Sequence, residues 1–421
     1  MDHAPPILTT TTVSAGRQWD RLMAMARLGA IPGDGVNRAC LTPLDREARR
    51  LLCAWAAEAG AAVSLDDAAN LWLRREGEEP GAAPVLTGSH MDTQPQGGRF
   101  DGIYGVIAGL EVLSAMHDAG VRTRRPVEVV AWTNEEGGRF APGCMGSMAW
   151  SGFKPLAAFA DARDPDGARF ADALAEHLAA ERDLPRRPLG PTRDATPHAY
   201  LEAHIEQGPR LERDGVDIGV VTGIQGSRWF TVTLDGETAH AGTTPLALRR
   251  DAVQDFVRAA DALNALMADP ADVLRFTIGR VVVRPNTSNS VADRVEFTID
   301  LRHPDGALLT ERGDAVEATV KRAVRDARVA VRETFHALPV AFAPAVVDAV
   351  ADAASAENLS AIPMPSGAFH DAQFVVPVCP TGMIFVPCRN GVSHNPAEYA
   401  SPEALAAGTR VLARALARLA A

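Results

Sequence analysis

Apolar positions recur along the chain with two periods, one typical of helices and one typical of strands. Residues 103–116 carry apolar side chains at helical spacing, which predicts an amphipathic helix. Residues 127–133 form an apolar, β-branched run, as expected of a buried strand. Similar patterns predict strands at residues 61–65, 71–74, 84–86, 218–223 and 382–386, and helices at residues 19–28, 43–60, 346–358 and from 402 onward. Strands that alternate with helices predict an α/β fold with a mixed, mostly parallel sheet and helices on both of its faces.

The order of elements changes in the middle of the chain. Strand patterns and helical patterns alternate there at residues 228–235 (strand), 246–267 (helix), 274–283 and 294–301 (strands), 308–327 (helix) and 329–334 (strand). This β-α-β-β-α-β order predicts a ferredoxin-like α+β unit. We therefore expect one discontinuous domain formed by residues 1–223 and 336–421, and an inserted domain at residues 224–335.

Length and charge limit the functions that the chain can have. With 421 residues it is long enough for two domains. Its 42 basic and 53 acidic residues give a net charge of −11, and an acidic surface repels nucleic-acid backbones and anionic membranes. We expect neither as a partner, and a small-molecule substrate fits better.

The five cysteines are an odd number and include no C-x-x-C pair, which argues against a disulfide framework and against a thiolate zinc site. The Thr-rich start has no basic segment followed by an apolar one, and no apolar run approaches the roughly 20 residues that span a bilayer. These features favour a cytoplasmic location.

Polar residues with metal-ligand chemistry follow the strand expected at residues 84–86. His90 and Asp92 come first, and Asp101 stands just before the helix at residues 103–116. An imidazole can bind a divalent metal through one ring nitrogen while a carboxylate fixes the other nitrogen. His90 is thus a candidate ligand with Asp92 as its orienter, and Asp101 could bridge two metals. Alone, a His-x-Asp pattern would more often be a hydrogen-bonded loop.

A second strand end carries the adjacent pair Glu135 and Glu136. Neighbouring side chains diverge at a strand end, so one of the pair could bind metal while the other faces a substrate. A Glu-Glu pair without this context would be read as a solvated turn. Here the pair directly follows a strand whose apolar sequence predicts burial, as His90 and Asp92 follow another such strand. Two such strand ends indicate a metal-assisted hydrolase.

Two further histidines lie in similar settings. His204 is surrounded by Glu202, Glu206 and Gln207, and spacing alone does not choose a ligand among these four. His394 lies in a polar loop just after the strand at residues 382–386.

Seven motifs, in order along nearly the whole chain, resemble those of the M20 peptidase-like family of dinuclear metallohydrolases. The closer likeness is to its branch of N-carbamoyl-L-amino-acid hydrolases, bacterial-type β-ureidopropionases and allantoate amidohydrolases. The motifs are GSHMDTQPQGGRFDG, WTNEEGGRF, EAHIEQGP, GETAHAGTTP, RPNTSNSV with DLRHPD, SGAFHDA and GVSHNPAE.

The resemblance implies two divalent metal ions, either zinc or manganese, cobalt or nickel. His90, Asp101 and His204 would hold one of them. Asp101, Glu136 and His394 would hold the other. The wider family commonly has a carboxylate at the position of His204, so its choice over Glu202 and Glu206 rests on the closer branch.

The resemblance also implies the remaining roles. Glu135 would be the general base and Asp92 the orienter of His90. His240, in TAHAGTTP, would stabilise the oxyanion from the neighbouring subunit, with the inserted domain forming a homodimer. Without the motif, His240 would be a surface histidine in a turn. The residues that match substrate-binding positions are Gln207, Arg228, His240, Asn289, Arg302 and His370. One departure is Phe369, which stands where the branch usually has glycine.

The expected reaction is hydrolysis of the ureido C–N bond of an N-carbamoyl-L-amino acid, or a β-ureido acid, to the amino acid, carbon dioxide and ammonia. Allantoate amidohydrolase is the alternative within the branch. A binding module that has lost turnover is the alternative from another class, and it is disfavoured by the complete set of ligands and base. An aminopeptidase or dipeptidase is disfavoured by His204 and by the Asn289 and Arg302 pair.

Overall fold

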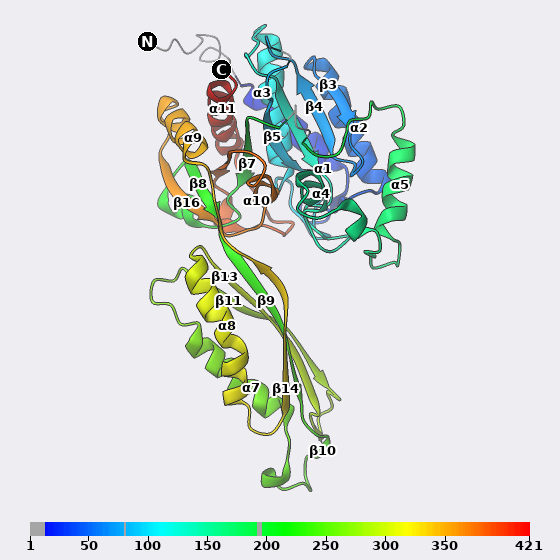
Figure 1. Cartoon of the computed structure of the whole chain (residues 1–421), viewed down its shortest axis with the longest axis vertical. Helices are drawn as coiled ribbons and strands as arrows, with labels where there is room; N and C mark the ends of the chain where they lie inside the picture. Colours follow the sequence, from blue (N-terminus) through cyan, green and yellow to red (C-terminus); the bar gives the residue numbers. More distant parts are fainter. Residues whose placement is uncertain (1–12, 80, 192–195) are drawn as a thin grey trace. The chain divides into compact units, whose positions relative to one another are not determined.

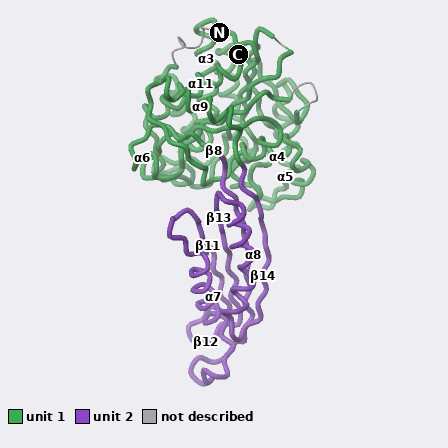
Figure 2. The backbone as a smooth tube through the Cα atoms, turned by 60° about the vertical axis from the view of Figure 1, so that its left-hand side comes forward, with its two compact units in different colours: residues 1–222, 341–421 green, residues 223–340 purple. Residues whose placement is uncertain are grey.

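The computed structural model describes residues 13–79, 81–191 and 196–421 (Figure 1). The Thr-rich start, on which the expected cytoplasmic location partly depends, lies largely outside these residues. Contacts between Cα atoms divide the chain into unit 1, Met1–Thr222 with Ala341–Ala421, and unit 2, Gly223–Val340 (Figure 2). The roles expected for the two domains stay predictions.

Unit 1 is built on a mixed nine-stranded sheet. Its strands follow the order β15-β8-β17-β7-β5-β6-β4-β3, and β16 pairs with β8. The four strands β17, β7, β5 and β6 are parallel, and antiparallel strands flank them. The sheet is therefore mixed with a parallel centre, in agreement with the predicted fold class. The bounds are β3 Ala62–Leu65, β4 Leu71–Arg75, β5 Val85–His90, β6 Val127–Trp132, β7 Ala199–Ile205, β8 Ile218–Ile224, β15 Val340–Ala341, β16 Ala361–Ser366 and β17 Thr381–Val386. Parallel strands bring their carboxyl ends to one edge of the sheet, where α/β proteins bind ligands.

Helices cover both faces of this sheet. Gly109 of α3 packs on Thr87 and Val129, so α3 lies on the face that these two side chains share. Trp132 points to the opposite face, where its ring packs against Trp150 of α4. The helices of unit 1 are α1 Ala15–Arg27, α2 Pro43–Glu58, α3 Ile103–Asp118, α4 Met145–Ser151, α5 Phe170–Ala180, α6 Arg210–Asp214, α9 Pro344–Ala356, α10 Ala372–Val375 and α11 Pro402–Leu419, and a small hairpin joins β1 Ala30–Ile31 to β2 Gly35–Val36.

Local sequence sets several of these boundaries. The Thr42 hydroxyl accepts from the N–H of Asp45, and Pro43 opens α2, as predicted. Ser401 and Pro402 start α11 in the same way. The strand predicted at residues 84–86 was too short, because β5 continues as far as His90. His90 stays in the strand since it pairs with Trp132 of the parallel neighbour.

Unit 2 has the predicted β-α-β-β-α-β topology. Its antiparallel sheet has the order β11-β13-β9-β14, with α7 and α8 packed on one face. The predicted helix start at residue 246 was wrong. The helix α7 begins at Ala252, because the Asp251 side chain accepts hydrogen bonds from the N–H groups of Val253 and Gln254 and so caps the helix there. Residues 246–248 form a separate 3-10 turn. The bounds are β9 Gly226–Asp235, β10 Ala239–His240, α7 Ala252–Leu266, β11 Arg275–Arg284, β12 Ser290–Val291, β13 Arg294–His303, α8 Gly306–Ala323 and β14 Arg328–Ala337. In the part of the chain that is described, none of the helices combines the length and apolarity needed to cross a bilayer.

Candidate metal centre

The five predicted metal ligands all lie at the carboxyl edge of the parallel strands. His90 ends β5, His204 lies near the end of β7, and Glu136 follows β6. Asp101 precedes α3, and His394 follows β17. These residues come from segments far apart in the sequence, and the parallel order of the strands is what brings them together.

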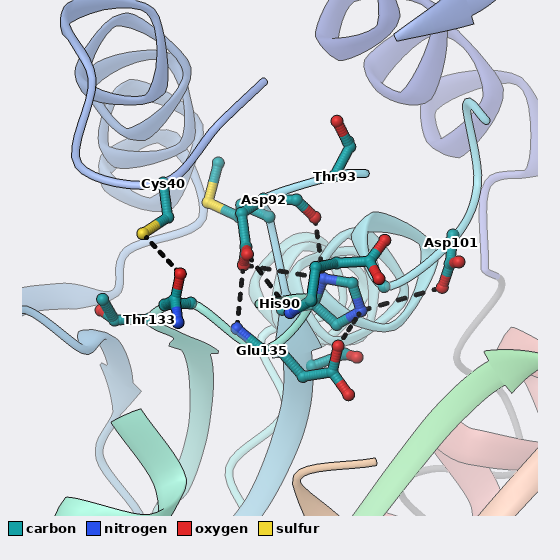
Figure 3. Close-up of polar contacts among 12 residues, drawn as sticks. Cys40, His90, Asp92, Thr93, Asp101, Thr133 and Glu135 are labelled. Carbon is teal, nitrogen blue, oxygen red and sulfur yellow. Dashed lines mark hydrogen bonds and ion pairs between the residues drawn. The ribbon is translucent and has the colours of Figure 1, made fainter. Parts of the chain in front are cut away.

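The carboxylate of Asp101 lies between two groups of ligand atoms. Its Oδ1 is 3.8 Å from His90 Nε2 (Figure 3). The same oxygen is 3.2 Å from His204 Nε2. Its Oδ2 is 3.3 Å from His394 Nε2, which is also 3.3 Å from Glu136 Oε2. Within each group the ligand atoms lie within 4.8 Å of one another. Each oxygen of one carboxylate thus faces a different group, as a bridging ligand requires.

Backbone carbonyls fix the tautomers of the two buried histidines. His90 Nδ1 lies 2.9 Å from the carbonyl oxygen of Asp92, and His204 Nδ1 lies 2.9 Å from that of Ile205. A carbonyl can only accept, so each Nδ1 carries a proton, and Nε2 is the ring nitrogen that remains for a metal ion. Both Nε2 atoms are directed at Asp101 and suit a metal ion, which shows that the donor set fits a divalent cation.

The charges in this cluster stabilise one another. Burial opposes ionisation of Asp101, but its contacts with His204 and His394 hold its pKa well below the usual value. Burial also opposes the charge on His204, yet the bond with Asp101 raises its pKa to about 9. Asp101 and Glu136 raise the pKa of His394 to about 10. The imidazole and carboxylate donors would be well satisfied by divalent cations.

The Asp92 side chain has a different set of contacts from the one expected. Its carboxylate lies 3.8 Å from His90 Nδ1, and the backbone carbonyl makes the closer contact. The carboxylate instead accepts from the N–H of Glu135 at 3.3 Å (Figure 3). It also accepts from the N–H of Glu136 at 3.3 Å. The Asp92 carboxylate therefore holds the backbone of the glutamate pair, and the Asp92 backbone carbonyl orients the His90 ring.

Glu135 and Glu136 diverge, as their place after a strand predicts. Glu136 joins the group around His394, and Glu135 Oε2 lies 3.3 Å from His90 Nε2. Burial raises the pKa of Glu135 well above its usual value, and the charges of Asp371 and Glu136 raise it further. A buried carboxyl with a raised pKa beside a candidate metal centre suits a general base.

The carboxylates near His204 are bonded elsewhere. Glu202 accepts from Ser89 Oγ at 2.7 Å and from the Tyr200 hydroxyl at 3.0 Å. Glu206 accepts from the N–H groups at the start of α6. Of His204 and the two nearby glutamates, only His204 belongs to a group that contains Asp101, and Glu202 forms a further group with His204 and His370.

Two of the substrate candidates of unit 1 lie beside the cluster. The Gln207 amide donates to Asp101 Oδ2 at 2.9 Å, and its Oε1 is buried without a partner among the described residues. The His370 ring centroid lies 4.5 Å from that of His204. Burial and the charge of His204 hold the pKa of His370 well below its usual value, so this imidazole is neutral.

The candidates of unit 2 fall into two places. His240 and Asn289 lie together, because β10 pairs with β12 and the N–H of Ala241 donates to the carbonyl of Asn289. Arg302 lies at the other end of β13, where Asp300 contacts it at 2.8 Å. Arg228 is buried within unit 2 between Glu333 and Asp314, contacts that favour a structural role for it.

Sequence reasoning missed several polar partners of the ligands. The Gln94 amide donates to Glu136 Oε2 at 2.9 Å, and Cys144 Sγ lies 3.6 Å from Glu135 Oε1. Glu398 accepts from the N–H of Asp101 at 3.0 Å. Glu398 could have been found, since it belongs to the motif GVSHNPAE that contains His394.

Comparisons with known proteins point to one family. The sequence pattern of peptidase family M20/M25/M40 matches residues 86–418. An N-carbamoyl-L-amino-acid amidohydrolase of Rhizobium meliloti is 39% identical over 96% of each chain. An allantoate amidohydrolase of Escherichia coli (strain K12) is 37% identical over 94% of this chain and 96% of that protein. The crystal structure of a hydantoinase/carbamoylase family amidase from Burkholderia multivorans matches with a TM-score of 0.90 at 44% identity, over 98% of this chain and 99% of that one.

Proposed function

We propose, from the premise that this chain belongs to peptidase family M20/M25/M40, that it hydrolyses the ureido C–N bond of an N-carbamoyl-L-amino acid to the amino acid, carbon dioxide and ammonia. Membership of the family confirms the resemblance inferred from the motifs. The observation that carries the proposal is the position of Asp101 between two groups of ligand atoms, with Glu135 beside them.

We propose two divalent cations per subunit, zinc or manganese, cobalt or nickel. His90, Asp101 and His204 would hold one cation, and Asp101, Glu136 and His394 the other. Bound there, the cations would lower the pKa of a water molecule and polarise the ureido carbonyl.

Glu135 takes a proton from the attacking water and returns it to the leaving nitrogen. Its buried carboxyl has a raised pKa, which suits a group that must hold the proton between the two transfers. Asp92 keeps the backbone of Glu135 in place, and Cys144 limits the freedom of its carboxylate.

His240 supplies the donor for the developing oxyanion. The N–H groups of Gly242 and Thr243 both donate to His240 Nδ1 at 3.1 Å. Nδ1 must therefore be an acceptor, which leaves the proton of the neutral ring on Nε2. The exposed Nε2–H is then free to donate to an oxyanion.

Arg302 and Asn289 bind the substrate carboxylate, but the geometry of β13 keeps them apart within one subunit. Asn289 precedes the first residue of this strand and Arg302 is near its end. At about 3.3 Å per residue, the strand from its first residue, Arg294, to Arg302 is roughly 26 Å long, and Asn289 lies before that first residue. A small substrate cannot touch both, so we propose a homodimer in which His240 and Asn289 come from the neighbouring subunit.

Two further parts of the proposal rest on composition and relatives. A cytoplasmic location is supported by the five cysteines, all of which are free. Allantoate is the second candidate substrate, because an allantoate amidohydrolase shares 37% identity with this chain.

The test is ammonia release from N-carbamoyl-L-amino acids, β-ureidopropionate and allantoate, before and after removal of metal by a chelator and its return. We expect the N-carbamoyl-L-amino acids to be the preferred substrates, and chelation to lower kcat by about 1000-fold or more, because the metals supply several kcal/mol. Full activity in a preparation verified to contain no metal would refute the metal mechanism. Preference for allantoate would replace the substrate assignment alone.

A further inference from the structure

We propose that Glu398 is the positioning residue that fixes the loop of Asp101 to the loop of His394, and so sets the spacing of the two groups of candidate ligands. This inference rests on the proposed metal centre. It concerns a side chain that lies outside both groups and is completely buried.

One oxygen of Glu398 holds the backbone of the Asp101 loop. Glu398 Oε1 accepts from the N–H of Phe100 at 2.9 Å and from the N–H of Asp101 at 3.0 Å. Two adjacent N–H groups that share one carboxylate oxygen fix the peptide that joins their residues.

The other oxygen reaches the loop of His394. Glu398 Oε2 lies 2.8 Å from Ser393 Oγ, the hydroxyl of the residue before His394. The same hydroxyl lies 3.1 Å from Asp101 Oδ2. One buried carboxylate thus joins two loops that are almost 300 residues apart in the sequence.

The packing around Glu398 leaves it little room to move. A Cβ atom on Gly98 would lie 2.1 Å from the Glu398 carboxyl, so only glycine allows this close approach. The next residue, Tyr399, places its ring edge-on to Phe100 with 6.0 Å between the centroids. The two segments are therefore packed together as well as hydrogen-bonded.

The arrangement predicts an unequal effect on the two groups of ligands. Loss of Glu398 frees both Asp101 and His394, which make up two thirds of one group. The other group keeps His90 and His204, whose tautomers are fixed by other carbonyls. We expect Glu398→Ala to weaken binding of one metal equivalent by about 10- to 100-fold, the range seen when partners of metal ligands are lost, and the other equivalent less.

The test is a titration of the metal-free protein with zinc in a metal buffer, with bound metal measured by atomic absorption. Glu398→Gln keeps an oxygen for the two N–H groups and should restore much of the affinity. Asp255→Ala is the matched control, because buried Asp255 clamps the N–H groups of residues 325–327 in unit 2 in the same way. It should lower thermal stability and leave both equivalents in place.

Each outcome decides one proposal. Two equivalents bound with wild-type affinity by Glu398→Ala would overturn this inference alone, as would an equal loss in Asp255→Ala. A wild-type protein that binds no zinc would overturn the proposed metal centre, and this inference with it. If Glu398→Ala does not fold, Glu398→Asp, with its shorter side chain, should show the same selective loss, and unchanged binding would count against the role.

Discussion

The two units present their candidate residues in opposite ways. In unit 1, His90, Asp101 and His204 are almost fully buried and contact one another. In unit 2, His240 and Asn289 are exposed, and Arg302 lies at the far end of a strand from them. The first set converges on one point, whereas the second is spread along a sheet.

This difference reflects what each set must do. Buried charges are stable only when they are paired, so the unit 1 cluster is held in its arrangement before any ligand arrives. In unit 2, His240 Nδ1 accepts from the backbone N–H groups of Gly242 and Thr243, and its exposed ring leaves Nε2 on the side away from them. Changes in unit 1 should therefore affect chemistry, and changes in unit 2 recognition and charge stabilisation.

The sharpest test of the buried cluster is Glu135→Gln. An amide has nearly the same shape but cannot take up a proton, so kcat should fall about 100- to 10,000-fold, the range for loss of a general base. Bound metal should stay at the wild-type level, because Glu135 lies outside both groups of ligands. Glu136→Gln is the matched control and should lose metal. An active Glu135→Gln variant would remove Glu135 from the chemistry.

The same contrast separates what the sequence could predict from what it could not. The strands at residues 84–86 and 127–133 were recognisable from their apolar runs, and polar residues at their ends pointed to the edge where ligands gather. The four strands of unit 2 also follow their predicted order. Strand β7 lacks an uninterrupted apolar run. Its buried residues include Glu202 and His204, and these polar residues break the apolar pattern that would have predicted a strand.

The contacts of individual side chains were beyond the reach of sequence patterns. Glu398 and Asp101 are far apart in the chain and meet only because β17 and β5 lie in one sheet. The carboxylate of Asp92 was expected at His90, but the backbone carbonyl of Asp92 makes the closer contact with its Nδ1. Periodicity predicts which face a residue occupies, and not which of its atoms makes the contact.

The exposed set of unit 2 is tested most strongly by His240→Ala. Removal of a preorganised oxyanion donor should lower kcat by about 100- to 1000-fold. The fold and the metal content should be unchanged, because the hydrogen bonds of the ring to described residues are local, from the N–H groups of Gly242 and Thr243. A loss of metal would mean that His240 belongs to the cluster, and would break the contrast between the units.

Mixing experiments decide whether His240 acts across a dimer. His240→Ala subunits and Glu135→Gln subunits are each expected to be nearly inactive. A heterodimer would hold one complete site if the histidine acts on its neighbour. Random pairing in a two-fold dimer should then restore about a quarter of wild-type activity. No recovery at any ratio, with subunit exchange verified, would place His240 at the site of its own subunit.

A smaller effect is expected at Arg302, whose guanidinium can grip a carboxylate with two hydrogen bonds. Arg302→Gln should raise KM about 10- to 100-fold, because hydrogen bonds to charged groups contribute about 1.5–3 kcal/mol. Arg284→Gln is the matched control, since Arg284 is an exposed arginine of the same sheet paired with Asp293. A fall in kcat at unchanged KM would assign Arg302 to the chemistry.

The smallest expected effect comes from unit 1 itself. Phe369 is half-buried and adjoins His370, whose ring packs on His204. Phe369→Gly should raise kcat/KM for bulky N-carbamoyl-L-amino acids relative to small ones by about tenfold, because apolar pockets discriminate by size to this extent. Phe153→Ala, which removes an aromatic ring that is 65% exposed, should leave the ratio unchanged. An equal change for all substrates would mean that Phe369 supports the buried cluster, and that selection by side chain belongs to unit 2.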